Sequence, residues 1–163
     1  MEGPVATDAL DLFLELLRIP SPSGEERAVA DRVLAYLDEY GLEASEDGSG
    51  ALVGSTMGNI HLALEPTVDG EPLFFCAHLD TVPPTDAIEP VIVEGIVRNA
   101  RPTILGADNK AAVVAMVAAL GQVATERRPH AGVELLLTSK EEVGLLGAFA
   151  FDHTRLRARC GYV

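Results

Sequence analysis

The chain has 163 residues, of which 48% are apolar and 23% charged, and its formal net charge is −13. This length and composition suffice for one globular domain with a buried core. The acidity disfavours nucleic acid and anionic membranes as partners, because clustered Lys and Arg bind both. Part of the acidity can instead serve metal binding, since carboxylates and neutral imidazoles are ligands for cations.

The two cysteines, Cys76 and Cys160, do not form a disulfide framework. The first residues lack the basic and apolar segments of a signal peptide, and no apolar run is long enough to span a bilayer. We therefore expect a cytoplasmic protein.

The first 41 residues predict two helices. Apolar residues at helical spacing predict the first helix, which begins near residue 7 or 8 and ends at Pro20. Ser23 and Glu26 form a capping-box pattern at the start of the second helix, and Gly41 stands where a glycine cap ends one.

Residues 42–70 alternate short β-prone pieces with glycines, which predicts a meander or an edge hairpin. The β-prone pieces are residues 52–53 and 60–64. His61 lies between two apolar residues of the second piece, so we expect its side chain to face solvent. His61 is therefore a poor candidate for a metal ligand.

A short apolar run at residues 73–77, opened by a proline and followed by two more, predicts a buried strand. His78 and Asp80 follow directly and point the same way if the extended geometry continues. An imidazole beside a carboxylate at the carboxyl end of a strand suits a metal ligand and its orienting partner. The alternative is a histidine that ends a strand and an aspartate that starts a turn.

The rest of the chain alternates strands and helices. Residues 88–97 predict a hairpin, 109–125 a helix that is apolar nearly all round, and 133–138 a second buried strand. A short helix at residues 145–151 and the start of a strand at residues 160–163 follow. The predicted fold class is α/β, with a mixed, largely parallel sheet and helices on both faces.

Ligands gather at the carboxyl ends of the strands in such sheets. The sequence places His78, Asp80 and the adjacent pair Glu141 and Glu142 there, and it places Asp108 where a loop enters a helix. Taken singly, the three acids Asp108, Glu141 and Glu142 are typical of helix starts. Taken together, these residue types suit zinc and similar ions, with one glutamate on the metal and the other handling a proton.

Three ordered blocks carry a more specific signal, namely residues 78–84, 106–110 and 141–148. They resemble the signature blocks of the co-catalytic zinc exopeptidases, which include peptidase T, carboxypeptidase G and acetylornithine deacetylase. They are most similar to those of the peptidase T-like tripeptide aminopeptidases, and the similarity runs from about Leu10 to the end of the chain. The resemblance implies a zinc-dependent aminopeptidase or amidohydrolase that hydrolyses the N-terminal peptide bond of short peptides.

The resemblance also implies a role for each residue. His78 and Glu142 would each bind one of two zinc ions, and Asp108 would bridge them. Asp80 would orient the His78 imidazole, and Glu141 would act as the general base. A cis peptide bond is implied after Asp108. Cobalt or manganese is accepted by the same ligand types.

Family members are longer than this chain. The resemblance therefore implies that residues 1–163 form the amino-terminal part of a single metallopeptidase catalytic domain, without the lid domain, a further acidic ligand and a last histidine. We expect these residues alone to bind metal weakly, to turn over little substrate, and to self-associate as a homo-oligomer through an unpaired sheet edge.

Alternatives to the aminopeptidase interpretation stay open. One is an N-acyl-amino-acid deacylase of the same family, and another is a non-catalytic truncated module. A di-metal hydrolase of another bond type, such as a phosphatase, is disfavoured because few Lys and Arg residues lie near the three blocks.

Overall fold

The structure is a computed structural model that describes residues 8–85 and 88–163. Its centre is a five-stranded sheet with the order β1-β2-β6-β3-β7. The strands are β1 (Ala44–Glu46), β2 (Ile60–Leu64), β3 (Leu73–His78), β6 (Val133–Thr138) and β7 (Cys160–Tyr162). β3 runs parallel to β6 and β7, whereas β2 runs antiparallel to β6 and β1. The expected mixed sheet is therefore confirmed.

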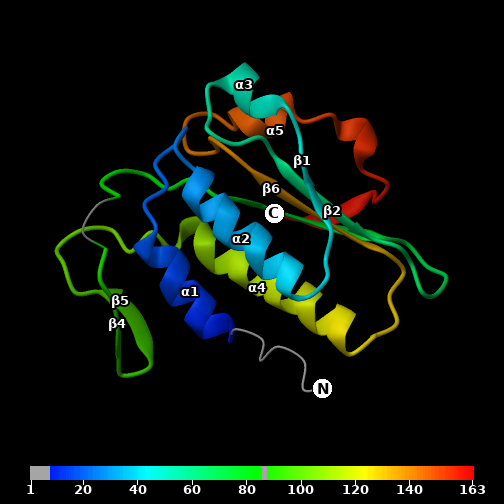
Figure 1. The fold of residues 1–163 in the computed structure, drawn as a ribbon, viewed down its shortest axis with the longest axis horizontal. Coiled ribbons are helices and arrows are strands. Elements are labelled where there is room, and N and C mark those ends of the chain that lie inside the picture. Colours follow the sequence, from blue (N-terminus) through cyan, green and yellow to red (C-terminus); the bar gives the residue numbers. More distant parts are fainter. Residues whose placement is uncertain (1–7, 86–87) are drawn as a thin grey trace.

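Three helices cover one face of this sheet: α1 (Ala9–Arg18), α2 (Arg27–Glu39) and α4 (Ala107–Thr125) (Figure 1). Because side chains alternate across a strand, Leu135 and Leu137 of β6 point toward these helices and are fully buried. They pack in one core with apolar residues of all three helices, among them Leu16, Val33 and Val117. The main core therefore lies between the helical layer and the centre of the sheet.

The opposite face carries α5 (Leu146–Ala150) and a 3-10 turn, η1 (His153–Arg155). Leu136 points to this face, and the His61 ring lies 5.8 Å from the ring of Phe151, which follows α5. The short helix α3 (Ser49–Val53) lies next to α5 (Figure 1). Helices on both faces are thus confirmed.

The predicted hairpin is confirmed as β4 (Pro90–Val93) and β5 (Ile96–Asn99), which form a separate two-stranded sheet near α1 (Figure 1). The two residues between the strands, Glu94 and Gly95, both have positive φ, at 53° and 77°. This is the conformation that a two-residue turn with the natural twist requires.

Both helices at the start of the chain are confirmed, but the predicted capping box is wrong. The Asp8 side chain caps α1 by accepting from the Leu10 amide, and Gly41 follows α2 with a φ of 68°. Glu26 stands at the N-cap of α2 without a side-chain capping bond, and the Ser23 hydroxyl donates to Asp80 instead. Ser23 therefore binds a distant partner instead of the local cap, and Glu26 binds Ser55 and Lys140 as well as the nearby Gly24 amide.

Two expectations for residues 42–70 are also wrong. Residues 52–53 belong to α3 rather than to a strand. His61 is only 9% exposed, because α5 and the chain that follows it cover the sheet face to which it points. Its Nε2 lies 3.3 Å from Oε1 of Glu134, which is also buried.

Candidate metal centre

The candidate site lies at the carboxyl ends of the parallel neighbours β3 and β6. His78 is the last residue of β3 and pairs in register with Thr138, the last residue of β6. The residues that follow each strand therefore meet at one edge of the sheet. The start of α4 brings Asp108 to the same place, where its Oδ1 lies 3.2 Å from His78 Nε2.

The His78 imidazole is buried, at 6% exposure, and its two nitrogens have different neighbours. Nδ1 lies 2.7 Å from the backbone oxygen of Asp80 and 3.5 Å from its Oδ1. Nε2 faces carboxylate oxygens, at 3.2 Å from Asp108 Oδ1 and 3.7 Å from Glu141 Oε2. Because a carbonyl oxygen can only accept, Nδ1 carries a proton and Nε2 is the nitrogen available to a metal.

Asp80 is fully buried, and its carboxylate accepts hydrogen bonds from the residues around the site. One oxygen accepts from the Glu141 amide at 2.8 Å, and the other accepts from the Glu142 amide at 3.1 Å and the Ser23 hydroxyl at 2.6 Å. The same residue thus positions His78 and both glutamates. Burial opposes the ionised form, but His78, Ser23 and the two amides together hold the pKa of Asp80 below its usual value.

The charged groups around His78 shift one another's pKa. Burial alone lowers the pKa of this imidazole, but the hydrogen bonds and charge of Asp80 and the charge of Glu141 raise it to about 9. The pKa of Glu142 is raised by burial and by the negative charges of Glu141, Asp108 and Asp80, while His78 opposes this shift. A positive charge among these groups therefore relieves mutual repulsion between carboxylates.

The donor set fits a metal ion. One ligand atom each from His78, Glu141 and Glu142 lie within 4.8 Å of one another. The Asp108 side chain is 84% exposed, and its oxygen contacts His78 from the open side. An imidazole nitrogen that faces carboxylate oxygens needs a proton or a cation between them, and nitrogen and oxygen ligands suit zinc. The peptide bond between Asp108 and Asn109 is cis, as the resemblance implies.

Sequence patterns assigned no role in the site to two buried charged residues that lie near it. Lys110 is fully buried, its Nζ donates to the backbone oxygen of Ile19 at 2.6 Å, and burial lowers its pKa to about 8. Glu26 is also fully buried and accepts from the Lys140 amide. The pattern around Glu26 suggested a local cap, so only the tertiary structure reveals its partner.

None of the helices in residues 8–85 and 88–163 combines the length and the apolar character needed to cross a bilayer.

An imidazole and carboxylates gathered at the strand ends of a mixed α/β sheet define a candidate metal centre of the hydrolase kind. Residues 59–162 match the peptidase family M28, and the chain belongs to this family. The family is one of peptidases, so the resemblance to exopeptidases, drawn from the three sequence blocks, is confirmed.

Solved structures of peptidase T-like enzymes share the fold. The chain is similar to aminopeptidase PepT from Bacillus cereus, with a TM-score of 0.88 and 34% identity over 94% of this chain and 42% of that chain. A tripeptidase from Staphylococcus aureus has the same TM-score and coverage at 30% identity. The cytosol non-specific dipeptidase of Escherichia coli is 34% identical over 91% of this chain and 31% of its own length. This chain therefore spans less than half the length of these relatives.

Proposed function

We propose that this chain carries the amino-terminal part of the catalytic domain of a zinc-dependent exopeptidase that removes the N-terminal residue of short peptides. The observation that carries the proposal is the position of His78 Nε2. It faces oxygens of Asp108 and Glu141 at 3.2 and 3.7 Å, where two parallel strands end. Similarity to an aminopeptidase and a tripeptidase over 94% of the chain supports the N-terminal specificity and the short peptide substrate.

In this proposal His78, Asp108 and Glu142 would hold the zinc, and Asp108 would be shared between two ions. The exposed position of Asp108 suits a bridging carboxylate, because its side chain is 84% exposed while its Oδ1 lies 3.2 Å from His78 Nε2. Asp80 fixes the imidazole through Nδ1, so that Nε2 is the nitrogen directed towards the other ligands. Bound zinc supplies Lewis acidity, which polarises a carbonyl and lowers the pKa of water.

Glu141 acts as the general base. Its side chain is 34% exposed, and its Oε2 lies 3.7 Å from His78 Nε2, so the carboxylate borders the position where the metal ligands converge. From there it takes a proton from the attacking water and transfers it to the leaving amine. The division of labour between Glu141 and Glu142 follows the resemblance, since both side chains reach the same space.

The proposal extends to location and assembly. We place the protein in the cytoplasm, in line with the cytosolic dipeptidase relative. We also propose that β7, an outer strand of the sheet, pairs with a second copy of the chain. Tyr162 on this strand is 65% exposed, and the free outer edge of a strand offers backbone hydrogen bonds to a partner.

A hydrolysis assay tests the proposal. Zinc-loaded protein is incubated with a panel of tripeptides carrying free or acetylated N-termini, beside Glu141→Ala and the matched control Glu25→Ala, whose side chain is exposed. We expect cleavage of the free-amine peptides, at a low rate, that disappears in Glu141→Ala and persists in Glu25→Ala. Cleavage of only the acetylated substrates would instead identify a deacylase. No cleavage by folded, zinc-bound protein would identify a non-catalytic module and contradict the proposal for this chain.

A further inference from the structure

Glu26 is a buried carboxylate for which neither the proposed mechanism nor the local helix cap accounts. It lies at the N-cap of α2, is fully buried, and makes no side-chain capping bond. We propose that Glu26 is a positioning residue that fixes the loop carrying Glu141 and Glu142. This inference rests on the proposed function, because it assigns Glu26 to the same metal centre.

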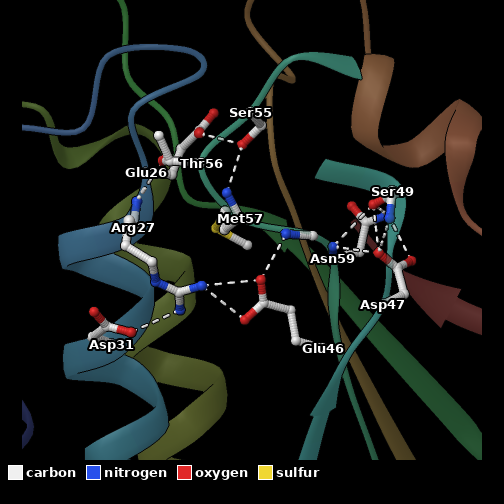
Figure 2. Close-up of polar contacts among 11 residues, drawn as sticks. Glu26, Arg27, Asp31, Glu46, Asp47, Ser49, Ser55, Thr56, Met57 and Asn59 are labelled. Atoms are coloured by element: carbon white, nitrogen blue, oxygen red, sulfur yellow. Dashed lines mark hydrogen bonds and ion pairs between the residues drawn. The ribbon is translucent and has the colours of Figure 1, made fainter. Parts of the chain in front are cut away.

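Three donors converge on the Glu26 carboxylate. Oε1 accepts from the Gly24 amide at 2.7 Å and from the Lys140 amide at 3.1 Å. Oε2 accepts from the Ser55 hydroxyl at 2.7 Å, as Figure 2 shows. These donors come from three segments that are distant in sequence. The carboxylate therefore joins the start of α2, the segment after α3 and the loop after β6.

Glu26 and Asp80 act on consecutive peptide units. Glu26 binds the amide of Lys140, and Asp80 binds the amides of Glu141 and Glu142. Two buried carboxylates thus hold three successive amides at the point where the proposed base and metal ligand leave the backbone. The Lys140 amide lies one peptide unit before the Glu141 amide, so a shift of the Lys140 amide moves the backbone that carries the Glu141 side chain.

The same loop is supported from α3 and its flanks. Lys140 Nζ donates to the backbone oxygen of Val53 at 3.0 Å, and Asn59 Nδ2 donates to the backbone oxygen of Gly147 at 2.9 Å. Figure 2 shows that Asn59 is itself held by Asp47 and Ser49. Both ends of residues 140–147 are therefore hydrogen-bonded to α3 or to the residues that flank it, and Glu26 connects this region to α2.

Two substitutions separate the effect of the length of the Glu26 side chain from the effect of its charge. Glu26→Gln keeps the length and one oxygen for the Gly24 and Lys140 amides, while its NH2 group faces a Ser55 hydroxyl that can reverse to accept. Glu26→Asp keeps the charge but withdraws the carboxylate by one methylene, away from the Lys140 amide. The matched controls are Glu25→Gln and Glu25→Asp at the exposed neighbouring position.

Two readouts test the inference on residues 1–163. Hydrogen–deuterium exchange reports the protection of residues 139–145 without metal, and calorimetric titration with zinc reports affinity. For Glu26→Asp we expect exchange of this segment to rise at least fivefold and zinc affinity to fall about tenfold, as for residues that orient metal ligands. We expect Glu26→Gln and both Glu25 variants to stay within about threefold of wild type in zinc affinity.

The contrary result is a Glu26→Asp protein that has a lower melting temperature but unchanged zinc affinity and unchanged exchange at residues 139–145. That result would overturn the inference, because it is the signature of a purely structural role. Failure of the proposed function looks different. Wild-type protein that binds no zinc would remove the metal centre, while the exchange measurement would still decide whether Glu26 holds the loop.

Discussion

Replacing Asp80 by alanine is a severe test of the hydrogen bonds that support the proposed metal centre. The substitution leaves the Glu141 and Glu142 amides and the Ser23 hydroxyl without their acceptor. A hydrogen bond to a charged group contributes about 1.5–3 kcal/mol. Three such bonds at the low end sum to roughly 4.5 kcal/mol, which is a large part of the 5–15 kcal/mol that stabilises a typical domain. We therefore expect Asp80→Ala to lower the free energy of unfolding by about 4–5 kcal/mol.

Urea denaturation at pH 7 measures this loss, with Asp38→Ala as the control at an exposed helical position. The control should change the free energy of unfolding by less than about 0.5 kcal/mol. If Asp80→Ala cannot be purified, Asp80→Asn replaces it, with an expected loss of about 1.5–3 kcal/mol because one oxygen acceptor remains. A loss below about 1 kcal/mol for Asp80→Ala would show that the three hydrogen bonds do not form as described.

The pH dependence of the same difference has a defined sign. The pKa of Asp80 is lowered in the folded state, so its contribution is fully present above the unfolded pKa of about 3.9. The contribution is lost as the pH falls through the folded pKa. The stability difference between wild type and Asp80→Asn should therefore shrink as the pH falls below about 4. A difference that grows as the pH falls below about 4 would contradict this assignment.

A side chain at Gly147 would collide with the backbone oxygen of Ser139, so Gly147→Ala should cost about 1–3 kcal/mol in urea denaturation and weaken zinc binding. Burial raises the pKa of the Cys76 thiol to about 11, and Cys160 is exposed, so mass spectrometry should find iodoacetamide on Cys160 first at pH 8. Lys110 has its pKa lowered from 10.5 to about 8, so the folded state binds fewer protons than the unfolded state between these values. Wild type should thus gain stability relative to Lys110→Met as the pH rises from 8 to 10, and equal pH profiles in urea denaturation would contradict this.

Periodicity predicted most of the fold because its signals are local. The alternating or apolar runs that became β2, β3 and β6, and the helical spacing of α1, α2 and α4, depend on residues close in sequence. The prediction of a strand at residues 52–53 was wrong because two β-prone residues are too few to outweigh the tight packing of their neighbours. Gly50, for example, leaves no room for a Cβ beside the backbone of Met57.

The residues of the candidate site were predicted from the sequence, but the hydrogen bonds that hold them in place were not. The sequence places His78, Asp80 and the two glutamates after strands, but the parallel pairing of β3 with β6 is what brings Asp80 against the glutamate amides. The contact between Glu26 and Lys140 spans 114 positions, so no local pattern carries it. His61 was assigned to the correct side of its strand, but the cover over that side comes from the distant α5 segment.

Anomalous diffraction at the zinc edge, from crystals soaked in zinc, would locate the metal in the proposed centre. We expect density for zinc bonded to His78 Nε2, at about 2.0–2.1 Å, and to carboxylate oxygens of Asp108 and Glu142, with Glu141 outside the coordination shell. Zinc held by Glu141 in place of Glu142 would contradict the division of labour between the two glutamates. Absence of zinc from His78 at saturating concentration would contradict the metal centre itself.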